Sequence, residues 1–298
     1  MQTPFTKMNG SGNDFVIFDA RHDSIRLSPE QVRSIAARDN ATTKGCDQVI
    51  VLEHSQKADV FMRIFNADGG QIDACGNATR CVAGILEAEL HRLPVSIETN
   101  VAVLQGLQKA YSPEEEEYIL VDMGAPSFEA SRIPLAGSAE EVAKKIEALT
   151  GLTDPSFVNM GNPHVVFFLR FSPGGNSQRD VEPLFEIALE SIGPKLEKAR
   201  DIFPEGVNAS IALLREASDG LGHIMNARVW ERGAGLTQAC GTAACAMLAA
   251  AHARDESITQ AHIWFEPFGT SVTVKRDEQG HMLLGGPIAT EHRGVVAL

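Results

Sequence analysis

Short runs of β-branched, aromatic and other apolar residues, bounded by Gly, Asn, Asp or Pro, recur along the chain and predict strands. The expected strands lie at residues 15–18, 47–52, 58–65, 95–99, 118–123, 165–169, 209–214, 224–230, 263–265 and 272–274. Helical patterns interrupt these runs in both halves of the chain. The alternation predicts a mixed α/β protein.

Two helices are predicted from their start signals. At residues 28–31, Ser-Pro-Glu-Gln supplies an N-cap, a proline at the first helical position and a capping-box glutamine, and Val32 and Ile35 follow at helical spacing. Residues 138–141 repeat the capping-box pattern, and Gly151 supplies a stop. We therefore expect a capped helix in each half of the chain.

One segment of the chain is repeated. Residues 73–83, DACGNATRCVA, resemble residues 238–248, QACGTAACAML. Each copy follows a turn-rich stretch and leads into an alanine-rich segment, so each predicts a loop, a cysteine and then a helix. One copy lies in each half, which indicates a duplicated domain. The best candidate for a junction between the halves is the Gly-Ala-Pro sequence at 124–126.

The predicted position of Cys75 and Cys240, each at a helix N-terminus, suggests acid–base chemistry. Backbone N–H groups and the positive end of the helix dipole favour a thiolate there and lower the thiol pKa. The same N–H groups form an anion site, which Gly76 and Gly241 leave open to close approach. If the two halves face each other, one thiolate can remove a proton from a carbon while the opposing thiol returns one to the other face. The pair predicts a racemase or epimerase that needs no cofactor.

A structural role is the alternative for each cysteine. Free cysteine is among the most buried residue types, and Cys-Gly before a helix can simply be a tight turn. For one copy alone that interpretation is preferable, but two matching copies favour function. Cys46, Cys81 and Cys245 lack the helix-start placement, and we expect them to be packed core thiols.

Composition excludes several classes of protein. The 298 residues are 44% hydrophobic and 22% charged, as in ordinary globular proteins. A formal net charge of −13 opposes binding to nucleic acid and to anionic membranes. No signal-peptide pattern is seen, and residues 233–252, the longest uncharged stretch, are too polar to span a membrane. Five cysteines without a close pair predict a reducing cytoplasm, and the nine histidines form no metal-ligand pattern, so we expect no metal.

Several sequence blocks, taken together, resemble the diaminopimelate epimerase family over nearly the whole chain. They are KMNGSGNDF at 7–15, RIFNADG at 63–69, CGN at 75–77, GNPH at 161–164, and ERGAG at 231–235 with CGT at 240–242. The resemblance implies a cofactor-independent isomerase that interconverts LL- and meso-2,6-diaminopimelate, in bacterial lysine and peptidoglycan precursor biosynthesis.

The resemblance also implies a fold. It consists of two pseudo-symmetric α/β domains, each a curved mixed β-sheet wrapped around a central helix, with the active site in the interdomain cleft. In this chain the implied domains are residues 1–123, completed by a C-terminal strand at 284–298, and residues 124–283.

Residue roles follow from the matched positions. Cys75 and Cys240 correspond to the catalytic acid and base, and His164 and Glu231 to a supporting polar pair. The positions that match substrate-binding residues are Asn13, Gln48, Asn66, Gly76, Asn77, Asn162, Asn208, Glu231, Arg232, Gly241 and Thr242. Arg232 can pair in a bidentate way with a distal carboxylate, while side-chain oxygens accept from a distal ammonium. Such a site suits a substrate with two amino-acid ends.

Several positions depart from the family pattern, among them Asn9, where a histidine is common, and Ala74, where a larger residue is often found. Ala78 and Ala243 stand where the family usually has a second glycine, and because alanine is the better helix former both helices should form. His292 stands where family members often carry a tyrosine at their dimer contact. The implied assembly is a homodimer, and the implied ligand is diaminopimelate.

Other functions are open from the sequence. The nearest is a two-cysteine racemase of the same fold that acts on proline, hydroxyproline or another amino acid, although a proline-sized substrate would leave the distal polar residues unpaired. An isomerase with a single carboxylate base would not need both cysteines. From a different class, a thiol sensor would use the same two activated cysteines, and a zinc module would need converging Cys and His ligands.

Overall fold

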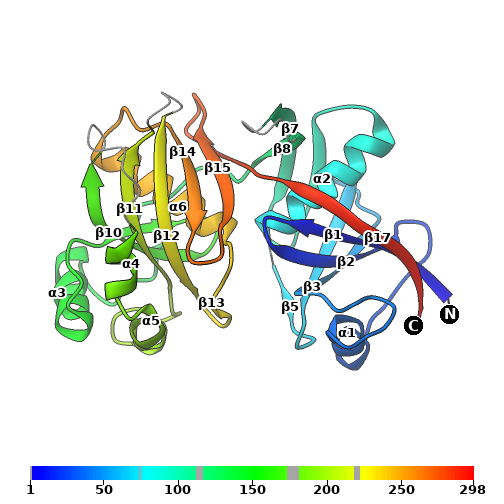
Figure 1. Ribbon diagram of the computed structural model, residues 1–298, viewed down its shortest axis with the longest axis horizontal. Coiled ribbons are helices and arrows are strands. Elements are labelled where there is room, and N and C mark those ends of the chain that lie inside the picture. The colour runs from blue at the N-terminus through cyan, green and yellow to red at the C-terminus, as the bar shows by residue number, and fades with distance from the viewer. Residues whose placement is uncertain (1, 74, 112–116, 173–180, 218–221) are drawn as a thin grey trace. The chain divides into compact units, whose positions relative to one another are not determined.

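The computed structural model describes residues 2–73, 75–111, 117–172, 181–217 and 222–298 (Figure 1). The chain divides into two compact units. Unit 1 consists of Met1–Asp122 with Gly285–Leu298, and unit 2 consists of Met123–Leu284. Among the helices of the described residues, none is long and apolar enough to cross a membrane. All five cysteines lie in the described residues, and none of them forms a disulfide.

The sheet of unit 1 has the strand order β17-β1-β2-β3-β4-β6-β7-β8. The strands are β1 (Gln2–Gly10), β2 (Asn13–Ala20), β3 (Gln48–Glu53), β4 (Val60–Asn66), β6 (Val95–Glu98), β7 (Val103–Tyr111), β8 (Glu117–Asp122) and β17 (Ile288–Ala297). The β2–β3 and β4–β6 pairs are parallel and the others antiparallel. A short strand, β5 (Gln71–Ile72), pairs with β4. Figure 1 shows β17, from the C-terminus, running along β1.

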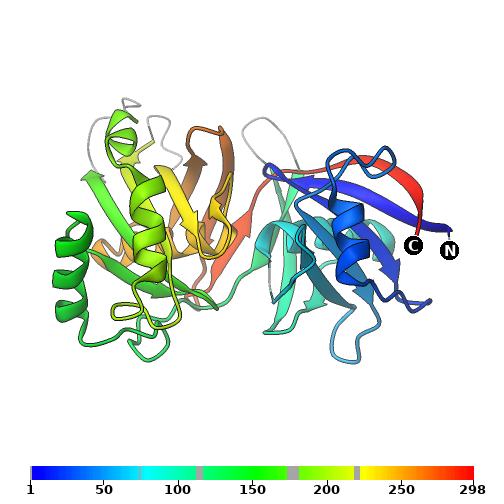
Figure 2. The same ribbon diagram turned by 90° about the horizontal axis from the view of Figure 1, so that it is seen from below.

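Two helices pack on this sheet. The helix α2 (Gly76–Leu90) contacts β1, β6, β7, β8 and β17, so the strands wrap around it. The helix α1 (Pro29–Ala36) packs against β3, and Figure 2 shows it beside the strands of unit 1. Both halves of the predicted Ser28 capping box are formed, and α1 buries Val32 and Ile35. The prediction of this helix is confirmed.

The sheet of unit 2 has the strand order β9-β10-β11-β12-β14-β15. The strands are β9 (Ser156–Asn159), β10 (Pro163–Ser172), β11 (Asn208–Glu216), β12 (His223–Glu231), β14 (Gln260–Phe265) and β15 (Thr270–Arg276). A short strand, β13 (Gly235–Leu236), pairs with β12, and β16 (Met282–Gly285) follows β15 in the chain. The helix α6 (Gly241–Arg254) contacts β9, β10, β11, β14 and β15.

The sequence of α6 suits a helix enclosed by strands. Residues 243–251 are each no more than 1% exposed, and most of them are alanine. Small side chains let the strands approach on every side, and a helix that is apolar all round belongs inside the protein. Alanine also has the highest helix propensity, so α6 forms without glycine at position 243. The helix α2 likewise forms with Ala78 in its first turn, as predicted.

Outer helices cover the other face of the unit 2 sheet. They are α3 (Ala139–Thr150), α4 (Glu182–Glu186) and α5 (Leu189–Lys198). The α5 helix contacts β11, β12 and β13, and Figure 2 shows it beside these strands. Gly193 is required there, because an added Cβ would lie 2.3 Å from Cγ of Trp230. The predicted Ser138 capping box and the Gly151 stop of α3 are both present.

The two units repeat one topology. In unit 1 the successive pairs from β1 through β2, β3, β4 and β6 to β7 are antiparallel, parallel, antiparallel, parallel and antiparallel. In unit 2 the pairs from β9 through β10, β11, β12 and β14 to β15 follow the same sequence. The enclosed helices α2 and α6 occupy the same place in the chain order. The predicted fold class, a mixed sheet around a helix in each half, is confirmed.

Candidate active site

In unit 1, Cys75 is the N-cap residue of α2. Its backbone is extended, with φ −150° and ψ 111°, and its carbonyl accepts from Thr79 N at 3.0 Å and from Thr79 Oγ1 at 2.9 Å. The thiol is half-buried. The first N–H groups of a helix have no partner within the helix and carry partial positive charge. Cys75 therefore lies beside a local anion site, as the sequence predicts.

The first turn of α2 is tied to the turn between β1 and β2. Asn77 is 2% exposed, and its Nδ2 donates to Asn13 Oδ1 at 2.5 Å. Asn13 Nδ2 donates in turn to Asp47 Oδ2 at 3.3 Å. Arg38 forms ion pairs with Asp47 and with Asp14. Two predicted substrate-binding residues thus belong to one hydrogen-bonded chain that ends in an anchored carboxylate.

The pKa values of Asp14 and Asp47 are shifted in opposite directions. Hydrogen bonds from Arg38 and Lys7 lower the pKa of Asp14 and outweigh its burial. Burial is the main cause that raises the pKa of Asp47, and the Asp14 charge adds to it. Lys7 is 2% exposed and its Nζ lies 2.8 Å from Asp14 Oδ2. The carboxylate that orders Asn13 therefore belongs to a group of charged side chains that extends from the buried Lys7 to the exposed Arg38.

Gln48 and Asn66 are opposite one another in the β3–β4 pair. Gln48 Nε2 donates to Asn66 Oδ1 at 3.1 Å. Gln48 Oε1 is buried and has no hydrogen-bond partner among the described residues. An unpaired buried acceptor costs about 1–3 kcal/mol, so such an atom marks a place where a donor on a ligand would bind.

In unit 2, Cys240 is the N-cap residue of α6, with φ −133° and ψ 111°. Its side chain is 6% exposed, and Sγ lies 3.4 Å from Thr242 Oγ1. Burial raises the pKa of Cys240 well above its ordinary value, and the Glu231 carboxylate, which accepts a hydrogen bond from the thiol, raises it further. The predicted lowering by the helix N-terminus is wrong for Cys240, because loss of hydration outweighs the dipole.

Glu231 is held from two sides. Thr237 Oγ1 donates to Glu231 Oε1 at 2.5 Å, and the Cys240 thiol is its second partner. Burial raises the pKa of Glu231, and these two hydrogen bonds act in the opposite direction. Glu231 is thus placed to influence the protonation of Cys240 directly.

His164 lies on β10 and is fully buried. Its Nε2 lies 2.7 Å from Asn162 Oδ1, and Asn162 Nδ2 donates to Thr242 Oγ1 at 3.3 Å. Burial, followed by the positive charge of Arg232, lowers the pKa of His164 to about 3. The ring is therefore neutral near pH 7, and since Asn162 presents an oxygen, Nε2 carries the proton. Nδ1 is buried and has no partner among the described residues.

Asn208 and Arg232 complete the unit 2 set. Asn208 is buried, its Nδ2 donates to Pro163 O at 3.0 Å, and its Oδ1 accepts from Arg232 N at 2.9 Å. The Arg232 side chain is exposed, and Nη1 donates to Glu205 O at 2.7 Å. The Asn208 amide therefore fixes the backbone at Arg232, while the guanidinium keeps donors for another partner.

The predicted site residues of the two units occupy equivalent positions. Asn13 and Asn162 both follow a turn glycine with positive φ, 90° at Gly12 and 88° at Gly161. Gln48 and Asn208 are the first residues of β3 and β11, and Asn66 and Glu231 are the last residues of β4 and β12. Cys75 and Cys240 are the two helix N-caps. The hydrogen bond from Asn77 to Asn13 has its counterpart between Asn162 and Thr242.

The structure adds residues that the sequence analysis did not single out. They are Asp47, Arg80 and Thr237. A signal was present for two of them, since Asp47 directly precedes Gln48 and Arg80 is the one charged residue in the segment 75–83. Within the described residues, no group of three His, Cys, Asp or Glu side chains could hold a metal ion.

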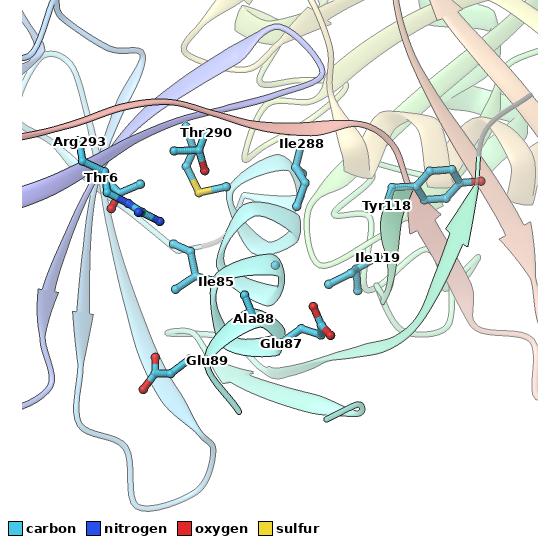
Figure 3. Close-up of a pocket in the computed structure, with 12 residues that line it drawn as sticks. Thr6, Ile85, Glu87, Ala88, Glu89, Tyr118, Ile119, Ile288, Thr290 and Arg293 are labelled. Atoms are coloured by element: carbon cyan, nitrogen blue, oxygen red, sulfur yellow. The ribbon is translucent and has the colours of Figure 1, made fainter. Parts of the chain in front are cut away.

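A cavity of about 520 Å³ lies elsewhere in unit 1 (Figure 3). Its lining includes Ile85 and Glu87 of α2, Tyr118 of β8, and Ile288 and Arg293 of β17. No residue of the predicted site lines it.

Sequence comparisons give a consistent result. The family model described as diaminopimelate epimerase matches residues 5–129 and 156–289. The chain is 42% identical over 291 residues to the diaminopimelate epimerase of Acidiphilium cryptum, covering 98% of this chain and 95% of that one. It is 37% identical over 306 residues to the diaminopimelate epimerase of Caulobacter vibrioides, covering 99% and 97%.

Solved structures share the fold at lower identity. A phenazine biosynthesis protein of the PhzF family from Bacillus anthracis has a TM-score of 0.65 and 19% identity, with 100% of both chains covered. A hydroxyproline epimerase from Agrobacterium vitis, solved with trans-4-hydroxy-L-proline, has a TM-score of 0.58 and 16% identity, with 100% of this chain and 93% of that chain covered. At these identities the likeness concerns the fold alone.

Proposed function

The chain belongs to the diaminopimelate epimerase family, an isomerase family of lysine biosynthesis, and from this premise we propose that Cys75 and Cys240 are its two acid–base groups. The observation that carries the proposal is that each cysteine is the N-cap of the enclosed helix of its own unit, at equivalent positions of a repeated topology. A pair of thiols related in this way suits proton transfer on two faces of one α carbon.

The proposed reaction balances without a cofactor. The bond between the α carbon and hydrogen breaks, the proton passes to the sulfur of one cysteine, and the electron pair stays on the substrate, delocalised toward its carboxylate. The S–H bond of the other cysteine then breaks as its proton passes to the opposite face of the carbon. After one turnover the two cysteines have exchanged protonation states. The substrate is inverted from the LL to the meso isomer or back.

Cys240 begins this cycle as the thiol. Burial and the neighbouring Glu231 carboxylate raise its pKa, so the proton is retained until a carbanion develops beside it. When Cys240 has given up its proton, the Thr242 hydroxyl and the backbone N–H of Ala243 act to stabilise the thiolate. Glu231 supports this step through its hydrogen bond with the sulfur, and His164 supports it through its hydrogen bond with Asn162.

Substrate binding divides into two chemical tasks. The reacting carboxylate is proposed to bind the helix-start groups of Gly76, Asn77, Gly241 and Thr242, where N–H donors stabilise the charge that develops during proton loss. The distal amino-acid end is proposed to bind Arg232 through its carboxylate and side-chain oxygens through its ammonium. Gln48 Oε1, a buried acceptor without a partner among the described residues, supports the presence of such a donor.

The setting of the enzyme is also part of the proposal. Five free cysteines fit a reducing cytoplasm. The product serves lysine synthesis and, we propose, peptidoglycan precursors as well. We further propose a homodimer formed through the outer side of β17, where Val295 is 51% exposed on a strand that lies against β1.

The test of the substrate assignment is a comparison of two amino acids. Reduced protein is incubated with LL-diaminopimelate or with L-proline, and the isomers are separated by chiral chromatography. We expect conversion of LL-diaminopimelate to the meso isomer and no racemisation of proline. Turnover of proline alone would keep the two-thiol chemistry and reject the substrate.

A further inference from the structure

Arg80 is a charged residue with 0% exposure, in the first turns of α2. Its Nη1 donates to Asn77 Oδ1 at 2.8 Å, and its Nη2 donates to Ser11 Oγ at 2.7 Å. It thus joins the helix that begins at Cys75 to the turn before β2. We propose that Arg80 is a positioning residue that fixes the orientation of the Asn77 and Asn13 amides, so that both present N–H donors to the substrate carboxylate.

The orientation of the two amides follows from which neighbouring groups can donate and which can accept. A guanidinium only donates, so Asn77 must turn its oxygen toward Arg80. Asn77 Nδ2 is then left to donate to Asn13 Oδ1. Asn13 must in consequence direct Nδ2 to Asp47, whose carboxylate only accepts. A donor-only group at one end and an acceptor at the other therefore determine the orientation of both amides.

The fixed orientation has a consequence for binding. Both amide oxygens are used by internal donors, from Arg80 to Asn77 and from Asn77 to Asn13. Each NH₂ group carries two hydrogens and uses one of them in this chain. The second hydrogens are the groups left for a ligand, and they match a carboxylate. A reversed amide would place an oxygen against that anion.

Unit 2 provides an internal comparison. Met160 precedes Gly161 as Ser11 precedes Gly12, and Cys245 follows Cys240 at the spacing at which Arg80 follows Cys75. Met160 and Cys245 belong to one buried apolar cluster. The repeated fold therefore does not require an arginine at this helix position. Unit 2 also has Thr242 in place of Asn77, and a hydroxyl can rotate its hydrogen without an amide to orient. The arginine occurs in the unit whose helix start carries an amide, Asn77, in place of a hydroxyl.

The proposal rests on the function proposed above, and it is tested with Arg80→Gln, Arg80→Lys and Ser11→Ala in the full-length protein. Arg80→Gln removes the charge and can both donate and accept, so it no longer sets the direction of the amides. We expect KM for diaminopimelate to rise at least about tenfold, with a smaller change in kcat. Arg80→Lys, which still only donates, should recover part of the loss.

Ser11→Ala is the matched control. It removes a second hydrogen-bond partner of Arg80, so it should lower the melting temperature while KM stays within about threefold of the wild-type value. If Arg80→Gln lowers the melting temperature as Ser11→Ala does and leaves KM unchanged, Arg80 is only structural and the proposal is wrong. If Arg80→Gln does not fold, Arg80→Lys decides the matter by the same comparison of KM.

Two further measurements separate this proposal from the function it rests on. In a double-mutant cycle, Arg80→Gln should raise KM by a much smaller factor in an Asn77→Thr background, which reproduces the residue of unit 2. An equal rise in KM in both backgrounds would overturn the proposal. Side-chain ¹⁵N spectra need no turnover. We expect slowly exchanging Asn77 and Asn13 NH₂ groups in the wild type and in Ser11→Ala, and fast exchange in Arg80→Gln. Inactive wild-type protein that shows this pattern would reject the substrate and retain the positioning role.

Discussion

Asn77 donates a hydrogen bond to Asn13 over 2.5 Å, and this contact joins the helix start at Cys75 to the turn between β1 and β2. Asn162 makes the corresponding contact with Thr242 in unit 2, beside Cys240. Each proposed acid–base cysteine is thus next to a residue that is fixed by the turn of its own sheet. The repeat explains why two similar chemical environments arise from one chain.

We expect Cys75 and Cys240 to be indispensable for activity. We expect another cysteine on one of the same helices, Cys245, to be dispensable. Cys75→Ala and Cys240→Ala should each lower kcat/KM by about a thousandfold or more, because each removes an acid–base group. Cys245→Ala is the control, since its side chain lies on the same helix and belongs to the apolar cluster of unit 2. It should keep most of the activity. Near-normal turnover by either single variant at 75 or 240 would reject the two-thiol assignment.

His164 should not titrate near neutral pH. Its pKa of about 3 lies well below that of an exposed imidazole, because the ring is buried and Arg232 is positively charged. NMR of the ring carbons should show no His164 titration between about pH 5 and 8. A step in that range that is lost in His164→Gln would contradict the placement of this ring.

The lowered pKa of His164 also predicts that the stability of the folded protein depends on pH. Between the folded pKa of about 3 and the unfolded value of about 6.5, the unfolded state binds more protons at this site. The contribution of His164 to the free energy of unfolding is therefore complete above the unfolded pKa and falls as the pH is lowered toward the folded one. The free energy of unfolding in urea should fall less between pH 7 and pH 4.5 in His164→Gln than in the wild type. An equal loss in both proteins would contradict this prediction.

Arg232→Lys tests recognition of the distal carboxylate. A lysine keeps the charge but loses the planar pair of donors, so KM for diaminopimelate should rise about tenfold while kcat changes less. Arg200→Lys is the matched control, because Arg200 is exposed and bonds a loop carbonyl, that of Pro204. Its steady-state constants should stay near the wild-type values. Equal effects of the two substitutions would place the distal carboxylate elsewhere.

Restoring glycine at the helix starts should weaken the fold. Ala78 and Ala243 are both fully buried in the first turns of α2 and α6. Replacing either by glycine should lower the free energy of unfolding by about 1 kcal/mol, because glycine has the lower helix propensity. Thermal unfolding measures the change. Increased stability would show that the methyl groups are strained in these positions.

Much of the fold could be predicted from local sequence. The capping boxes at Ser28 and Ser138 begin α1 and α3 as expected, and the β-branched runs lie within strands. The first strand was not predicted, because it contains Pro4 and Lys7 and lacks an apolar run. Lys7 can be buried because its ammonium pairs with Asp14, on the neighbouring strand, and donates to the carbonyl of Gly45. Such a contact depends on the sheet and leaves no hydropathy signal.

The candidate site was predictable to a similar degree. The repeated Cys-Gly motif indicated both N-caps, since it combines a residue type with a helix start. Arg80 and Asp47 were not predicted, because their roles come from contacts with Asn77 and Asn13 across distant parts of the chain. The pKa of Cys240 was predicted in the wrong direction, because the depth of burial is not visible in the motif. The sequence motifs identified most of the candidate side chains, whereas the packing around these side chains determines their pKa values.

The central claim is that two different thiols act on opposite faces of one α carbon, and isotope partition at early conversion tests it most directly. LL-diaminopimelate is converted in deuterated water, and the reaction is stopped after a few per cent conversion. We expect α-deuterium in the meso product and none in the recovered LL isomer, because the proton removed and the deuteron returned are held by different cysteines. Product that retains the substrate's own α-hydrogen, or deuterium appearing equally in both isomers, would contradict it.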